Sequence, residues 1–216
     1  MEGRFNDESA KHPNSENIEQ FEATGGKISN REIMAQARGS LKGRWGLAIG
    51  TVLVYWIICI AVEEIPKAGW LISILISGPM SLGLCIFALS LSRRKNPKFE
   101  QLFRGFKRFG VALAAFLLRI IFIILWSLLL VVPGIIASFR YSMTYYIIAE
   151  NDSIGPLEAI KKSKEMMRGN KWKLFCLCWR FLGWDLLCIL TLGIGFLWLM
   201  PYRTIAFARF YDDVAV

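Results

Sequence analysis

Histidine is nearly absent from this chain, whose only example, His12, lies in a polar N-terminal stretch. The apolar part therefore has no imidazole for acid–base chemistry, and no serine–histidine–aspartate triad can form there. It also lacks a pair of carboxylates within the apolar blocks, a glycine-rich phosphate loop and a cluster of metal ligands. We expect a protein that is not an enzyme and that uses no cofactor and no metal.

Disulfide patterning and a secretory leader are also missing. The five cysteines are an odd number and lie inside apolar blocks, without the spacing of a disulfide framework or a zinc site. We expect them to act as small apolar packing residues. Residues 1–28 contain no apolar run, so they are no signal peptide, and their polar composition predicts a disordered tail.

Long apolar runs are what the chain has in excess. Its hydrophobic fraction is 55% and its mean hydropathy is +0.42. A helix needs about 20 apolar residues to cross a bilayer. The expected spans are 45–62, 69–91, 111–132, 135–149, 172–192 and a sixth that follows 193–195 and ends near residue 211. We predict an all-α, six-span transmembrane helix bundle in which the spans pair into three helical hairpins.

The net charge of +9 comes mostly from lysines and arginines between the apolar runs. Basic residues are dense before the first span, between the second and third, and between the fourth and fifth, whereas the other connections are nearly free of them. Because cytoplasmic loops carry the excess of Lys and Arg, we predict a multi-pass protein of the cell membrane with both termini in the cytoplasm. The same pattern favours membrane lipids, anionic ones included, as partners and argues against nucleic acid.

The spans are interpretable as three copies of one unit, over residues 29–91, 96–149 and 153–211. Each copy opens with a basic amphipathic cytoplasmic helix, then has an aromatic where the chain enters the membrane, and later a proline in the helix that returns. Helix starts are marked by the capping box Ser29 to Glu32, by Asn96-Pro97 and by Gly155-Pro156. The alternative is that any hairpin bundle shares basic flanks and interfacial aromatics.

Ionisable residues inside spans are the candidate functional residues. The four arginines Arg119, Arg140, Arg180 and Arg203 each lie at roughly 12 Å from the cytoplasmic end of their span, at 1.5 Å rise per residue. They are candidates for one binding site for an anion or a lipid phosphate, which suits the guanidinium fork. The alternative is that each reaches separately toward the headgroups.

Asp185 is the candidate charge partner of these arginines, because a lone carboxylate near the middle of a span is costly. Arg180 lies about 140° around the same helix, which makes a direct pair awkward. We therefore expect Arg119 or Arg140, on another helix, to face Asp185.

Three ordered strings of residues add a resemblance: PGIIASFRYSM, then EAIKKSKEMMRGNKWKLF, then GIGFLWLMPYRTIAFARFY. With LKGRWGLAIG near the start, they resemble a family of bacterial integral membrane proteins known only as a domain of unknown function. The resemblance covers roughly residues 33–213 and implies a multi-span membrane protein, without an established substrate or reaction. The chain departs from the family pattern at Cys178, Arg180 and Asp185, so a general role for Asp185 does not follow from the resemblance.

Three functional hypotheses follow. The first is a non-enzymatic membrane protein that binds an anionic lipid or a small anion, or helps to move it. The second is a scaffold or accessory subunit that docks a protein partner through its cytoplasmic amphipathic helices. The third is a membrane-embedded enzyme. A copurifying ligand would favour the first hypothesis, and a copurifying protein the second.

Overall fold

The computed structural model describes residues 28–66, 69–191 and 193–215, and this part of the chain is helical, without a strand. The predicted all-α fold is confirmed. The tail predicted for residues 1–28 lies outside the described residues except for Ile28, whose backbone N–H donates to Asp213 at 2.9 Å. The helices, in chain order, are α2 (Asn30–Leu41), α3 (Trp45–Glu63), α4 (Gly69–Ser92), η1 (Phe99–Arg108), α5 (Phe109–Leu129), α6 (Val131–Arg140), α7 (Thr144–Glu150), α8 (Pro156–Met166), α9 (Lys171–Leu190) and α10 (Phe196–Val214).

Three helical stretches are long and apolar enough to cross a membrane: Trp45–Glu63, Gly69–Ser92 and Phe99–Leu128, the last of which joins η1 to most of α5. Their outer surfaces carry large apolar side chains, for example Ile57 at 60% and Leu128 at 83% exposure. A large apolar surface is unfavourable in water but compatible with the hydrocarbon of a lipid bilayer. Helices α9 and α10 expose apolar side chains too, but charged residues interrupt them.

Two predicted helix starts are confirmed and one is wrong. The side chain of Ser29 caps α2 by accepting the backbone N–H of Glu32, and α8 begins at Pro156. The segment after Asn96-Pro97 begins only at Phe99, as a 3-10 helix without a side-chain cap.

The expected span at 135–149 is divided. Helix α6 ends at Arg140 and α7 begins at Thr144. The Ser142 hydroxyl donates to the carbonyl of Phe139, and that of Thr144 to the carbonyl of Tyr141. Both hydroxyl bonds lie at the break, where such bonds can compete with the helical ladder.

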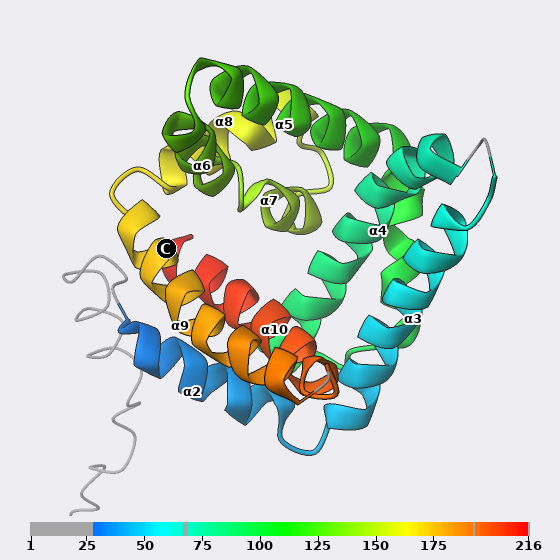
Figure 1. The fold of residues 1–216 in the computed structure, drawn as a ribbon, viewed down its shortest axis with the longest axis vertical. Helices are drawn as coiled ribbons and strands as arrows, with labels where there is room; N and C mark the ends of the chain where they lie inside the picture. The colour runs from blue at the N-terminus through cyan, green and yellow to red at the C-terminus, as the bar shows by residue number, and fades with distance from the viewer. Residues whose placement is uncertain (1–27, 67–68, 192, 216) are drawn as a thin grey trace, which may run out of the picture.

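Six of the helices form a closed ring in chain order. Contacts join α3 to α4, α4 to α5, α5 to α6, α6 to α9, α9 to α10 and α10 back to α3. Figure 1 shows α3 with α4 on one side, α5, α6 and α8 on a second, and α2, α9 and α10 on a third, with α7 toward the middle. The helices thus form three groups, and the third group contains both the first helix, α2, and the last, α10.

Each of the three short amphipathic segments, α2, η1 and α8, packs on a helix that returns from a hairpin. Segment η1 packs on α4, α8 packs on α7, and α2 packs on α10 at the other end of the chain. This cyclic arrangement is what three repeated units would produce, although the repeats themselves stay a prediction. The main core gathers where these elements meet and includes Leu41, Phe87, Ile148 and Phe210.

Candidate functional site

A cavity of about 270 Å³ lies beside Arg119 and is bounded by α4, α5, α6, α7 and α10. We call it the Arg119 cavity. It is lined by Ser81, Leu84, Cys85, Phe116, Arg119, Ser138, Ser142, Tyr145, Tyr146 and Phe207. The lining contains hydroxyls and one guanidinium but no carboxylate.

The Arg119 guanidinium has no carboxylate within ion-pair distance among the described residues. Its Cζ atom lies 5.6 Å from the centre of the Tyr145 ring, so the ring face holds the cation in place. The Tyr145 hydroxyl is buried and lacks a hydrogen-bond partner within the described part of the chain. The cavity lining therefore carries one positive charge, held on the ring of a tyrosine whose hydroxyl has no partner in the described part of the chain.

Arg203 and Asp185 form an ion pair, with 3.7 Å between the arginine Nη1 and the carboxylate Oδ2. The prediction that Arg119 or Arg140 faces Asp185 is wrong. The two residues are equally far along the chain from Ile194, in the turn between α9 and α10. An antiparallel hairpin brings such positions to one level, which the sequence reasoning overlooked.

The other two arginines have separate surroundings. The Cζ of Arg140 lies 6.0 Å from the centre of the Trp126 ring on α5. Arg180 is exposed and lines a surface hollow whose other lining residues, such as Trp172 and Trp179, all belong to α9. Arg203 lies 5.9 Å from the Phe207 ring, which also lines the Arg119 cavity. Of the four arginines, Arg119 is the member that lines a cavity bounded by several helices. A single site for all four stays a prediction.

A charged cluster that the sequence reasoning did not single out ties together the ends of the returning helices. Arg93, just after α4, donates to Glu150 at the end of α7 at 2.7 Å and to Asp212 in α10 at 2.8 Å. The Tyr211 hydroxyl donates to Glu150 at 2.6 Å, and its ring stacks on Tyr146 with centroids 5.5 Å apart. These contacts hold α4, α7 and α10 at one point.

A second pair anchors the same region. Asp213 is 3% exposed, accepts from Lys173 at the start of α9, and also accepts the N–H of Ile28. The sequence did contain a signal for this cluster. Two adjacent acids near the C-terminal end of α10 oppose the helix dipole, and such acids require basic partners.

The pKa of Glu150 reflects this cluster. Burial alone would raise it, but hydrogen bonds from Tyr211 and Arg93, with the charge of Arg93, outweigh burial and lower the pKa below its ordinary value of 4.5. Glu150 lies beyond the expected span, so its carboxylate contributes charge to the end of the bundle at neutral pH.

No cluster of three or more His, Cys, Asp or Glu side chains suited to a metal occurs within residues 28–66, 69–191 and 193–215. All five cysteines lie in this part of the chain and are free thiols. The arrangement offers charge and hydroxyl groups rather than metal ligands.

Comparison with known proteins gives one family. The family described as "Protein of unknown function (DUF975)" matches residues 28–137 and 128–216. No curated protein and no solved structure matches the chain.

Proposed function

Because the chain belongs to this family of proteins of unknown function, its site has to be judged by its chemistry, and we propose that the protein binds an anionic group in the Arg119 cavity. A phospholipid phosphate or a small anion supplies that group. The observation that carries the proposal is the Arg119 guanidinium, which lies over the Tyr145 ring in a cavity whose lining has no carboxylate.

Charge balance supports an anion as the ligand. A charged arginine inside a membrane costs about 2.5–3.5 kcal/mol even on mild insertion scales, so such residues pair with other groups. Asp185 is already beside Arg203. A phosphate bound to Arg119 would accept two hydrogen bonds from the guanidinium and one from Tyr145.

The proposal also specifies the location of the protein in the membrane and its orientation there. We place the protein in the cell membrane with both termini in the cytoplasm and with six spans, formed by α3, α4, α5, residues 131–149 of α6 and α7, α9 and α10. The three long apolar stretches support a membrane location. The alternation of basic loops supports the orientation.

The test measures binding of inorganic phosphate and of phosphatidylglycerol to the purified full chain. Arg119→Leu should abolish binding at this cavity, and Tyr145→Phe, which removes a single hydroxyl, should weaken it several-fold. Arg119→Lys should retain part of it, because the charge remains.

Arg180→Leu is the matched control, since Arg180 is exposed and lies outside the Arg119 cavity. Unchanged binding in Arg119→Leu, with an unchanged melting temperature, would overturn the proposal. Equal loss in Arg140→Leu, Arg180→Leu and Arg203→Leu would instead favour one shared site for the four arginines.

A further inference from the structure

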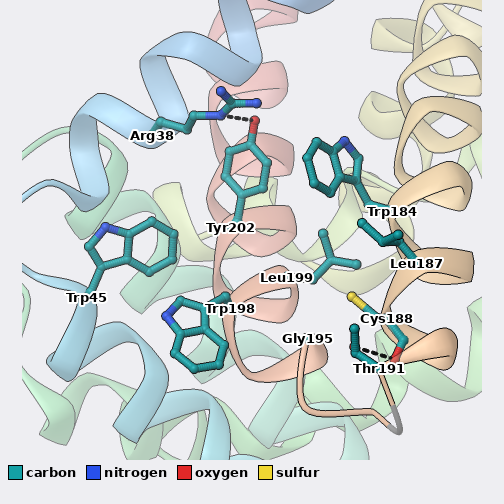
Figure 2. A pocket seen from close by; sticks show the side chains of 10 residues that line it. All are labelled: Arg38, Trp45, Trp184, Leu187, Cys188, Thr191, Gly195, Trp198, Leu199 and Tyr202. Atoms are coloured by element: carbon teal, nitrogen blue, oxygen red, sulfur yellow. Dashed lines mark hydrogen bonds between the residues drawn. The ribbon is translucent and has the colours of Figure 1, made fainter.

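A second cavity, of about 360 Å³, lies between α2, α3, α9 and α10. Figure 2 shows its lining residues, which are Arg38, Trp45, Trp184, Leu187, Cys188, Thr191, Gly195, Trp198, Leu199 and Tyr202. We call it the Arg38 groove. It shares no lining residue with the Arg119 cavity.

The groove is mostly apolar and open to the surroundings of the bundle. Trp184, Leu187 and Trp198 are 44%, 51% and 52% exposed. Tryptophan rings present a large apolar surface, with the N–H as their single polar group. The walls therefore match a hydrocarbon chain.

Arg38 stands at one end of the groove in a fixed position. Its Nε donates to the Tyr202 hydroxyl at 3.1 Å, and that hydroxyl donates to the Met34 carbonyl at 3.2 Å. The Arg38 Cζ lies 5.4 Å from the centre of the Tyr202 ring. In Figure 2 the guanidinium lies above Tyr202, with Trp45, Trp198 and Leu199 farther along the groove.

The two terminal nitrogens of Arg38 remain available. They have no acceptor among the described residues, and the side chain is exposed. A guanidinium held by Nε alone presents its other N–H groups to a phosphate.

The remaining polar groups of the lining narrow the choice of ligand. The Tyr202 hydroxyl is engaged with Met34 and Arg38, and the Thr191 hydroxyl donates to the Cys188 carbonyl at 2.9 Å. A polar ligand would leave its own hydrogen-bonding groups without partners along the groove, which is costly. A suitable ligand is an amphiphile, with hydrocarbon along the groove and a single anionic group at Arg38.

We infer that the Arg38 groove binds one anionic phospholipid, with an acyl chain along Trp45, Trp184 and Trp198 and the phosphate on Arg38. The expected orientation places Arg38 toward the cytoplasm, so the lipid comes from the inner leaflet. This site is additional to the Arg119 cavity and is independent of what binds there.

Native mass spectrometry of the delipidated full chain tests the inference, with phosphatidylglycerol and phosphatidylcholine of identical acyl chains. The Arg119→Leu background separates this groove from the Arg119 cavity. In that background, phosphatidylglycerol should bind more tightly than phosphatidylcholine. Arg38→Gln should weaken its binding by at least about tenfold, the lower end of what one hydrogen bond to a charged group contributes, and Arg38→Lys should retain most of the preference.

Leu187→Trp, which fills the groove, should weaken both lipids alike. Arg31→Gln is the matched control, because Arg31 is an exposed arginine of α2 outside the groove. Excess inorganic phosphate should displace neither lipid. Equal binding of the two lipids, or equal loss in Arg31→Gln, would overturn the inference whatever the Arg119 cavity binds.

Discussion

At the scale of single residues, the acids near the end of α10 differ sharply from acids on the surface. The Asp213 side chain is 1% exposed and pairs with Lys173, whereas Asp152 is 98% exposed and lies 4.0 Å from Arg108. Removing one partner of a buried pair leaves an uncompensated charge, but an exposed pair contributes little.

We therefore expect Asp213→Asn to lower the free energy of unfolding by about 3 kcal/mol. Asp152→Asn is the control and should change it by less than about 1 kcal/mol. Unfolding of the purified variants by increasing concentrations of a denaturing detergent measures the two free energies of unfolding. Similar values for the two variants would show that the Asp213 pair is not an anchor.

Glu150 makes the stability of the bundle depend on pH. Its pKa is lower in the folded chain than the ordinary 4.5, so its contribution is complete above that value and is lost as the pH falls through the lower, folded value. The melting temperature should fall on acidification below about pH 4.5. Glu150→Gln should flatten that part of the curve, and an unchanged slope would contradict the assignment.

At the scale of elements, the tightest contact joins α4 to η1. A Cβ atom on Gly83 would lie 1.7 Å from the Leu102 carbonyl oxygen, and one on Gly105 would lie 1.9 Å from the Pro79 carbonyl oxygen. Both obstacles are backbone atoms, which cannot rotate away. The two glycines therefore let the two backbones touch.

Gly105→Ala should separate η1 from α4 and destabilise the chain by at least about 1–3 kcal/mol, the usual cost of overpacking. Gly110→Ala, two residues into α5, is the control, since a Cβ there meets no atom within 4 Å. It should be neutral or slightly stabilising, because alanine favours helix. Thermal unfolding in detergent compares the variants, and equal melting temperatures would argue against the contact.

Helix positions were largely predictable from the sequence because apolar blocks bounded by charge and glycine are strong local signals. The expected spans at 45–62 and 69–91 differ from α3 and α4 by one residue at one end. The break between α6 and α7 was not predicted, because residues 135–149 form one apolar run and apolar periodicity does not report where a run is interrupted.

The candidate site was only partly accessible to the same reasoning. Depth along a span is a local property, so the arginines could be ranked as candidates. Which way each side chain faces depends on packing between helices, and the sequence does not report that packing. This is why Arg119, which lines a cavity, could not be distinguished from Arg180, which lies on an exposed face. The role of Arg38 depends on Tyr202, which is far away in sequence.

At the scale of the whole molecule, the proposed orientation rests on the charge of the loops. A reporter fused at Val216 should give a cytoplasmic signal, and one inserted at Glu64, between α3 and α4, should give the opposite signal. Both fusions should accumulate to similar levels. Identical signals from the two positions would exclude the proposed six-span arrangement.

The contact between α2 and α10 has a consequence for chain connectivity. Ile28, just before α2, and Asp213, near the end of α10, are joined by a hydrogen bond of 2.9 Å, so the first and last helices meet without a peptide link. In a circular permutant, a short linker would join Asp213 to Ile28 and the new chain ends would be opened at Lys95. Such a permutant should keep the helix–helix contacts of the ring. Since each hairpin crosses twice in the proposed arrangement, the permuted chain also starts and ends on the original side of the membrane.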